Sequence, residues 1–483
     1  MRPDRTTLAG LSIPRLLTGL WQVADQEKDG TPTDIPAAAA QLSAYARAGF
    51  DAFDMADHYG SAELIAGEML RRWDGPDRPL AFTKWCPAPG PMTPEVVRAG
   101  VRERLDRLGV ARVDLLQFHW WSFEHPAWLD ALREIEALRQ EGLVGAIGVT
   151  NFDAAHLALA LSDGIPIASN QVSFSLIDRR AAGPLTTLCR ERGVRLLAYG
   201  TLCGGLLSER WLDKPRPEAV RDWSKMKYLR FVDAAGGWEA LQAILRATDR
   251  VARRHGASIS NVATRWVLDH DSVAAAIVGA RLGESEHRAD NLALFDLRLD
   301  DEDHAMLSEA FAATRPIPGD CGDEYRQPPF LTASGDLSHH LAEIPSAMSV
   351  VPDPDRPGRA RAFSGSEWEP LAGYCRAVRD RDRILVSGTT ATHGRDRVVA
   401  PSDAGAQTTY ILDKIAAAVR ALGGRPEDIL RTRLYLREAT DVDAAARAHG
   451  RCFATSPPAN TTFVVGDLIG DFRVEIEAEA VLS

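Results

Sequence analysis

The sequence predicts an α/β protein in which a (β/α)8 TIM barrel is followed by a smaller α+β domain. Residues 16–280 repeat one unit, a short apolar strand, a turn and an amphipathic helix, at a spacing of roughly 30 residues. The unit occurs eight times, which is the number that closes such a barrel. The chain of 483 residues is also too long for one ordinary core, and its composition changes near residue 315.

The eight predicted strands are short apolar runs that end in polar or aromatic residues. They span residues 16–22, 51–56, 80–85, 113–120, 145–151, 167–174, 194–200 and 273–280. Helical faces lie between them, for example over residues 94–109, 128–142 and 153–164. An insertion over residues 208–237 and two helices separate the last two strands. A doubly wound open sheet is the weaker alternative, because no Gly-x-Gly-x-x-Gly turn follows any strand.

Charge and cysteine usage narrow the class of protein. The formal net charge is −11, whereas a nucleic-acid partner requires a concentrated positive face. No run approaches the roughly 18 apolar residues of a membrane span, and the amino end has no apolar stretch of signal-peptide length. Six cysteines without a Cys-x-x-Cys pair predict reduced thiols and a cytoplasmic protein, and they predict no metal site.

Four side chains with complementary chemistry stand at the ends of three consecutive predicted strands. Asp54 and Tyr59 belong to the run FDMADHYG, Lys84 lies near the end of the next strand, and His119 near the end of the third. A parallel barrel gathers the carboxyl ends of its strands at one face. We therefore expect these four side chains to meet there.

Together the four residues resemble the catalytic tetrad of the aldo-keto reductases, whose pattern Phe-Asp-x-Ala-x-x-Tyr-Gly matches residues 53–60. The resemblance covers about residues 8–315 and implies the NADPH-dependent reduction of an aldehyde or ketone to an alcohol. Tyr59 would be the general acid, Lys84 the cation that lowers its pKa, Asp54 the anchor of Lys84, and His119 the group that orients the substrate carbonyl. A nucleotide-binding redox sensor or regulatory subunit is the alternative, and the complete tetrad favours an enzyme.

The resemblance also implies a site for NADPH or NADP⁺. The run IGVTNF is similar to the family's Ile-Gly-Val-Ser-Asn-Phe, and with a glutamine from the next strand it would hold the nicotinamide carboxamide. The run AYGTL supplies an aromatic ring for the nicotinamide, and the stretch from GAR onward would bind the adenosine 2′-phosphate and adenine. Arginine there favours NADPH over NADH. The predicted cofactor residues are Thr150, Asn151, Gln171, Tyr199, Gly200, Leu202, Arg281 and Asn291.

Tryptophans beside the tetrad predict the walls of a substrate pocket. They are Trp21, Trp85, Trp120 and Trp121, and packing in the core is the alternative for each of them. His58, next to the catalytic tyrosine, is interpreted as an ordinary loop residue, with a place in the pocket as the alternative. Specificity in such barrels lies in loops, here residues 120–127 and 205–237, and these do not identify the natural substrate.

Beyond the barrel the composition predicts a linker and a second domain. Residues 316–365 are rich in Pro, Gly and charge and lack periodicity, so they separate a domain over residues 1–315 from one over 366–483. In the second domain we expect strands within residues 376–390, 432–439, 460–468 and 472–481, and helices over 405–424 and 442–454.

The runs GYCRAV, VSGT, QT and VEIEA in this domain resemble the RidA (YjgF) family. Members usually form trimers with clefts between subunits, and some hydrolyse enamines or imines, so the resemblance implies a homo-oligomer. Active deaminases carry Pro-Ala-Arg, whose arginine grips the substrate carboxylate, whereas this chain has an uncharged Asn460. Arg433 is a candidate replacement; a non-carboxylate substrate and an assembly role are the alternatives. The predicted cleft residues are Tyr374, Ser387, Gly388, Arg433, Asn460 and Glu475.

Overall fold

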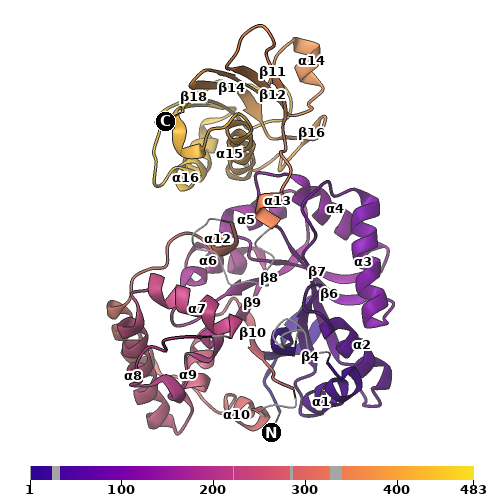
Figure 1. Cartoon of the computed structure of the whole chain (residues 1–483), viewed down its shortest axis with the longest axis vertical. Helices are drawn as coiled ribbons and strands as arrows, with labels where there is room; N and C mark the ends of the chain where they lie inside the picture. Colours follow the sequence, from indigo (N-terminus) through magenta and orange to yellow (C-terminus); the bar gives the residue numbers. More distant parts are fainter. Residues whose placement is uncertain (1, 24–32, 221, 283–286, 327–339, 483) are drawn as a thin grey trace.

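The computed structural model describes residues 2–23, 33–220, 222–282, 287–326 and 340–482. Two bodies follow one another along the chain (Figure 1). The first is a closed parallel barrel wrapped by helices, as predicted. The second is smaller and lies beside the helices α4 (Ala127–Gln140) and α5 (Ala154–Ser162) of the first.

The barrel strands agree with the predicted ranges to within one residue at each end, except for the first. They are β3 (Leu16–Gly19), β4 (Ala52–Ala56), β5 (Leu80–Trp85), β6 (Val113–His119), β7 (Val144–Thr150), β8 (Ile167–Ser173), β9 (Arg195–Tyr199) and β10 (Val273–Gly279). Neighbouring strands are parallel, and β10 pairs with β3 to close the barrel. The predicted first strand is too long, because the apolar run continues into a buried 3-10 turn, η1 (Trp21–Val23).

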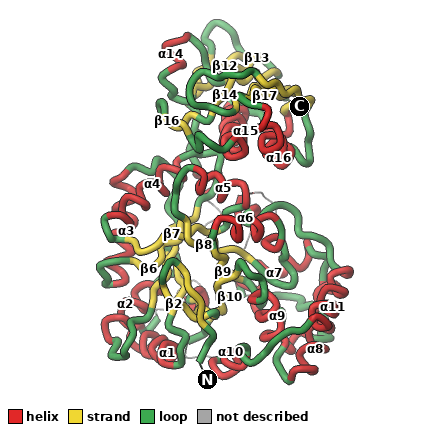
Figure 2. The backbone as a smooth tube through the Cα atoms, turned by 180° about the vertical axis from the view of Figure 1, so that it is seen from behind, coloured by secondary structure: helices red, strands yellow, loops and turns green. Residues whose placement is uncertain are grey.

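Helices cover the outside of the barrel (Figure 2). Capping side chains fix where several begin: Thr93 accepts the N–H of Val96 in α3, and Asp153 accepts those of Ala155 and His156 in α5. Besides α4 and α5, the helices of this body are α1 (Ile35–Arg47), α2 (Ala62–Arg72), α3 (Pro94–Leu108), α6 (Pro184–Arg192), α7 (Trp223–Ala234), α8 (Trp238–His255), α9 (Ile259–Leu268), α10 (Arg288–Ala293) and α11 (Asp301–Ala310).

An amino-terminal hairpin of β1 (Arg5–Leu8) and β2 (Leu11–Pro14), absent from the sequence prediction, closes one end of the barrel. Leu8 and Ile13 are fully buried and pack with side chains that fill the barrel interior, including Leu17, Phe82 and Leu115. The strands are four residues long each, too short for a clear alternation of apolar and polar residues. The barrel is thus open for a ligand at the other end, where its strands terminate.

The second body contains a seven-stranded sheet with two helices packed on one face (Figure 1). Its strand order is β11-β12-β13-β14-β19-β17-β18. The elements are β11 (Ser349–Pro352), β12 (Arg359–Phe363), α14 (Trp368–Ala372), β13 (Ala377–Asp380), β14 (Arg383–Thr390), α15 (Ala404–Ala421), β17 (Ile429–Leu436), α16 (Val442–Cys452), β18 (Ala459–Val464) and β19 (Val474–Val481), with a small ladder of β15 (Thr392–His393) and β16 (Arg397–Val398). In β19 buried and partly exposed residues alternate, as expected for a sheet with one covered face.

The predicted linker is not free of regular structure. β11 and β12 lie within residues 316–365 and extend the sheet of the second body: β12 pairs antiparallel with β13, and β11 pairs antiparallel with β12. They escaped prediction because all of β11 is exposed and β12 is mostly half-buried, so neither shows an apolar face. The linker also contains two short helices, α12 (Asp323–Arg326) and α13 (His340–Glu343), and residues 327–339 lie outside the described part.

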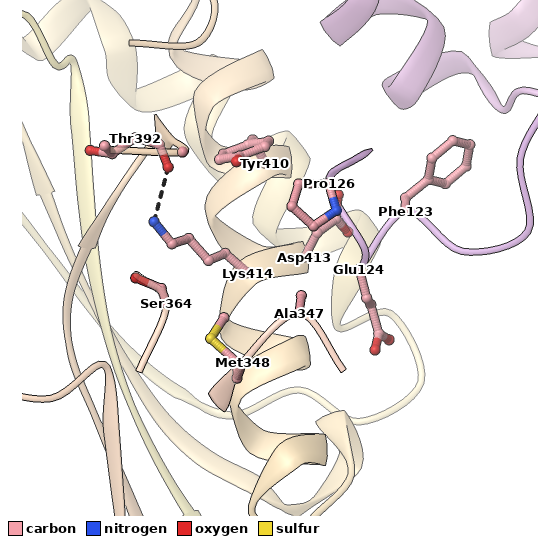
Figure 3. Close-up of a pocket in the computed structure, with 11 residues that line it drawn as sticks. Phe123, Glu124, Pro126, Ala347, Met348, Ser364, Thr392, Tyr410, Asp413 and Lys414 are labelled. Carbon is pink, nitrogen blue, oxygen red and sulfur yellow. Dashed lines mark hydrogen bonds between the residues drawn. The ribbon is translucent and has the colours of Figure 1, made fainter. Parts of the chain in front are cut away.

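Polar contacts join the two bodies along α4, α5 and α15. They include Ser162–Asp403 at 2.6 Å, His393–Asp130 at 2.7 Å, His156–Asp413 at 3.0 Å and Arg397–Asp163 at 3.1 Å. A cavity of about 40 Å³ remains between the bodies. Figure 3 shows Lys414 of α15 reaching the main-chain oxygen of Thr392 there, at 2.9 Å, with Phe123 and Glu124 on the barrel side.

Candidate active site

A cavity of about 630 Å³ opens at the carboxyl ends of the barrel strands. Asp54, Tyr59, Lys84 and His119 all line it, so the structure brings the predicted tetrad together. All the predicted cofactor residues line the same cavity: Thr150, Asn151, Gln171, Tyr199, Gly200, Leu202, Arg281 and Asn291. One face of the barrel therefore gathers both sets of side chains.

A buried ion pair forms the base of this cavity. Lys84 Nζ lies 2.8 Å from Asp54 Oδ2, and both side chains are almost entirely removed from solvent. The other carboxylate oxygen of Asp54 accepts hydrogen bonds from the side chains of Gln117 at 3.0 Å and Gln171 at 2.7 Å. The Lys84 ammonium is thereby held 4.9 Å from the ring centroid of Tyr59.

The turn that carries Tyr59 is fixed from the outside of the barrel. Glu63, in the first turn of α2, is fully buried and pairs with Arg104 at 2.9 Å and Arg107 at 2.7 Å, both from α3. Arg107 also donates a hydrogen bond to the main-chain oxygen of Gly60. The α2–α3 contact thus holds the backbone next to Tyr59.

The pKa of Tyr59 departs from the sequence expectation. Burial, followed by the negative charge of Asp54, raises the pKa of Tyr59 well above its ordinary value of 10. We expected Lys84 to lower this pKa, and that expectation is wrong, because the net shift is upward. The physical reason is that Asp54 neutralises the lysine while the phenol lies in a water-poor site. Tyr59 is therefore a protonated donor at neutral pH.

His119 is neutral at physiological pH and available to a ligand. Burial, then the charges of Arg326 and His58, lower its pKa well below the ordinary 6.5. Its Nε2 atom is buried and has no hydrogen-bond partner among the described residues. In the neutral tautomer with its proton on Nε2, the imidazole donates one hydrogen bond from this nitrogen, which then suits a carbonyl oxygen.

The residues around the predicted nicotinamide position fit such a group. Thr150 Oγ1 is buried and, within the described part of the chain, has no partner. Asn151 adopts a left-handed conformation with φ of 60°, and its Oδ1 accepts the Tyr199 hydroxyl at 2.9 Å. An unpaired hydroxyl beside an amide and an aromatic ring suits a carboxamide on a flat ring.

The predicted phosphate-binding arginine lies at the edge of the cavity. Arg281 contacts Asp222 at 2.6 Å, and 43% of its side chain is exposed. Burial acts to raise the pKa of Asp222, but hydrogen bonds from Lys225 outweigh it, so that carboxyl group has a lowered pKa. Arg281 and Lys225 could bind an anionic group at this edge of the cavity, where Asp222 now pairs with both of them.

Two of the predicted pocket tryptophans lie elsewhere. Trp85 and Trp120 are buried in the core, where both pack against Phe118 at centroid distances of 5.9 Å. Their assignment to the substrate pocket is wrong because successive side chains of a strand point to opposite sides. Each directly follows a residue, Lys84 or His119, that faces the cavity.

Other aromatic residues form the cavity walls. Trp21 meets the ring of Tyr59 edge-on at 4.9 Å, and Trp121 meets His119 at 4.5 Å. His58, expected to be an ordinary loop residue, also lines the cavity. Tyr325 reaches it from α12, and no signal in the sequence of the linker indicates this.

Four of the predicted cleft residues of the second domain lie around Arg376: Tyr374, Ser387, Gly388 and Glu475. A Cβ built on Gly388 would lie 2.1 Å from the Glu475 carboxylate, and Arg376 donates to the Gly388 oxygen at 2.6 Å and to the Tyr374 hydroxyl at 3.1 Å. Ser387 donates to a main-chain oxygen at 2.8 Å. Buried Arg376, which the sequence reasoning missed, supplies a cation beside Glu475.

Asn460 stands in place of the family arginine, and Arg433 is its candidate replacement. Arg433 pairs with Glu477 at 3.2 Å and Glu479 at 3.0 Å on the adjacent strand. Asn460 donates from its amide to Thr432 at 3.0 Å. Arg433 is therefore already neutralised by carboxylates of its own sheet, which weakens it as a clamp for a substrate carboxylate.

The structure is a closed parallel barrel with a buried ion pair, a tyrosine and a histidine in the cavity at its mouth. Residues 15–312 match the model of the family described as "Aldo/keto reductase family", and the chain belongs to this family of nicotinamide-dependent oxidoreductases. Residues 364–482 match the model described as "Endoribonuclease L-PSP", the RidA group. Both predicted resemblances are thus confirmed.

Curated relatives resemble parts of the chain. The flagellar radial spoke protein 5 of Chlamydomonas reinhardtii is 32% identical over 200 residues, which cover 37% of this chain and 36% of that protein. The chloroplastic pyridoxal reductase of Arabidopsis thaliana is 26% identical, with 64% and 86% covered. The NADH-specific methylglyoxal reductase of Escherichia coli is 27% identical, with 45% and 65% covered. Among the described residues, no helix is both long and apolar enough to cross a membrane.

Proposed function

We propose that the protein is an NADPH-dependent reductase of aldehydes or ketones. The observation that carries this proposal is the buried Asp54–Lys84 pair beside a protonated Tyr59, opposite the unpaired Nε2 atom of His119. A bound nicotinamide would supply the hydride. The chain supplies a neutral imidazole for the carbonyl oxygen and a phenol within the same cavity.

The proton-transfer step depends on residues of this chain alone. His119 donates to the carbonyl oxygen and orients it. As negative charge develops on that oxygen, Tyr59 transfers its proton, and the positive Lys84 stabilises the phenolate that remains. Asp54 keeps the lysine charged and in place.

NADPH is proposed over NADH because a positive group stands where the 2′-phosphate would bind. Arg281 lies at the cavity edge and is paired with Asp222, so an incoming phosphate exchanges one anion for another. The related methylglyoxal reductase of Escherichia coli is NADH-specific, so the two cofactors should be compared directly. We also infer a cytoplasmic location, since all six cysteines are free thiols.

The experiment compares full-length wild type with Tyr59→Phe, using a reactive aldehyde such as 4-nitrobenzaldehyde and either NADPH or NADH. Wild type should oxidise NADPH faster than NADH. Tyr59→Phe should lose activity by at least about 10²-fold with an unchanged Kd for the cofactor, because only the proton donor is removed. Equal rates in the two proteins would exclude Tyr59 from the mechanism, and cofactor binding without turnover would favour a sensor.

For the second domain we propose assembly of a homo-oligomer, with a trimer as the expected state. Large apolar side chains are exposed on and around β18 and on β17, and they suit a subunit contact: Leu430, Phe463, Val464, Val465 and Ile469. The neutral Asn460 and the occupied Arg433 argue against a 2-imino acid as substrate. Light scattering should give about three times the chain mass of 52.6 kDa. A monomer, or rapid hydrolysis of a 2-imino acid, would contradict this assignment.

A further inference from the structure

The segment that leaves the barrel, residues 320–326, packs against the rim of the cavity through a buried ion pair and hydrogen bonds. Glu324 is fully buried and accepts an ion pair from Arg180 at 2.9 Å. Arg326 donates to the main-chain oxygens of Asn151 at 2.7 Å and Trp120 at 3.0 Å. These contacts fix α12 against the ends of β6 and β7, beside the predicted cofactor residues.

The backbone of this segment also requires its glycine. Gly322 has φ of 92°, in the left-handed region, and a Cβ there would lie 2.1 Å from the main-chain oxygen of Asn151. A side chain would therefore collide with the strand end. Gly322 and the buried Glu324 thus both allow the segment to pack closely against the barrel at the cavity rim.

This segment places the side chain of Tyr325 in the wall of the cavity. Its ring is 8% exposed and meets His119 edge-on, with centroids 5.3 Å apart. Its hydroxyl lies 3.4 Å from that of Tyr199 and accepts a hydrogen bond from Lys227 at 2.5 Å. The ring thus stands between the predicted carbonyl-orienting histidine and the predicted nicotinamide-stacking tyrosine.

Aromatic rings also border the other sides of this space. Trp121 stands edge-on to His119, and Trp21 stands edge-on to Tyr59. A carbonyl oxygen bound at His119 Nε2 would direct its substituent among Trp21, Trp121 and Tyr325, all of which line one cavity. Aromatic rings prefer offset or edge-on contacts with other flat rings.

We propose that Tyr325, carried by the connection between the two domains, is a specificity-determining residue of the reductase site and selects planar aromatic carbonyl compounds. This inference rests on the proposed reductase function. It gives the connection a role in substrate choice, since Tyr325 is held by Lys227 of α7 and by its anchored neighbours Glu324 and Arg326.

The test uses full-length wild type, Tyr325→Phe, Tyr325→Leu and Tyr325→Met with NADPH. The substrates are benzaldehyde and cyclohexanecarbaldehyde, which have equal numbers of carbon atoms but a flat and a puckered ring. Wild type should prefer benzaldehyde in kcat/KM. The Leu and Met variants should lower kcat/KM for benzaldehyde about tenfold, mainly through KM, and change the value for cyclohexanecarbaldehyde less than about twofold. Tyr325→Phe should keep the preference because it keeps the ring.

The outcomes separate this inference from the function on which it rests. Wild-type turnover with the same substrate ratio in the non-aromatic variants would overturn the role of Tyr325 and leave the reductase intact. A loss explained by weaker NADPH binding, measured by fluorescence titration, would overturn it as well. No turnover of either aldehyde by wild type would overturn the reductase function, and this inference with it. Two non-aromatic variants are used so that misfolding of one does not decide the result.

Discussion

At the scale of single residues, the direction of each strand side chain decides its role. Lys84 and Trp85 are neighbours on β5, yet one pairs with Asp54 in the cavity and the other packs against Phe118 in the core. Side chains of a strand alternate between two faces, so a catalytic residue and its neighbour seldom share a site. Trp121 lies two residues after His119 and returns to the cavity side.

Substituting Trp121 and Trp85 should separate the two roles. Trp121→Phe shortens a wall of the cavity beside His119, so KM for an aromatic aldehyde should rise several-fold. Trp121 is also buried and donates to the main-chain oxygen of Pro87 at 3.0 Å, so the unfolding midpoint should fall as well. Trp85→Phe removes volume from the core and should lower the free energy of unfolding by about 1–3 kcal/mol with an unchanged KM. Steady-state kinetics and thermal unfolding measure both. A raised KM for the aromatic aldehyde in Trp85→Phe, with an unchanged KM in Trp121→Phe, would place Trp85 in the substrate site.

Most of the site could be predicted from short stretches of sequence, and the exceptions share a cause. Asp54, Lys84 and His119 stand at the ends of apolar runs, so periodicity alone brings them to one face. Tyr325 lies in a linker whose composition carries no pattern, and tertiary contacts alone place it beside His119. The pKa of Tyr59 could not be predicted either, because it depends on how much water the fold excludes.

At the scale of elements, the α2–α3 contact supports the catalytic turn. Glu63 is enclosed by Arg104 and Arg107 of α3 and also accepts the hydroxyl of Thr83 on β5 at 2.6 Å. Burial raises the pKa of Glu63, and the arginines and Thr83 partly offset this shift. The sequence of α2 gave no reason to expect a buried carboxylate, because its partners come from elements about 20 and 40 residues later.

Glu63→Gln should destabilise the barrel and slow catalysis. It leaves two arginines near a buried site without their carboxylate, which should lower the free energy of unfolding by about 3–5 kcal/mol. The turn at Gly60 should also be less firmly held, so kcat should fall. Glu103→Gln is the matched control, because Glu103 contacts Arg104 from an exposed position and should contribute less than about 1 kcal/mol. Chemical denaturation measures the difference; equal effects would remove the structural role assigned to Glu63.

At the scale of the whole molecule, the contact between the bodies contains two groups whose pKa values are shifted in opposite directions, Lys414 and His156. Burial, followed by the charge of Arg376, lowers the pKa of Lys414 to about 7, so its contribution to stability should grow as pH rises from about 7 towards the ordinary 10.5. Burial also acts to lower the pKa of His156, but the carboxylates of Asp153 and Asp413 outweigh it, and the net shift is upward. Stabilisation by His156 is therefore complete below about pH 6.5 and is lost as pH rises through its raised pKa.

Asp413→Asn should expose the contribution of His156 to this contact. His156 is stacked on Phe123 at 3.6 Å and bridges Asp153 of its own body at 2.5 Å and Asp413 of the second body at 3.0 Å. Removing the charge of Asp413 should lower stability by about 1.5–3 kcal/mol near pH 6, where the imidazolium is present, and by less near pH 9.

Thermal unfolding of the full chain at both pH values, in a Lys414→Met background that removes the opposing titration, measures this difference. Arg451 and Asp320 also approach the site, with Arg451 lying 3.9 Å from both Asp153 and Asp320, and burial raises the pKa of Asp320. Asp130→Asn is the control, because Asp130 binds His393 from a position that is 45% exposed and should contribute less than about 1 kcal/mol. An effect of Asp413→Asn that is equal at the two pH values would mean that His156 does not change its charge between them, and would contradict the predicted loss of its stabilisation as pH rises.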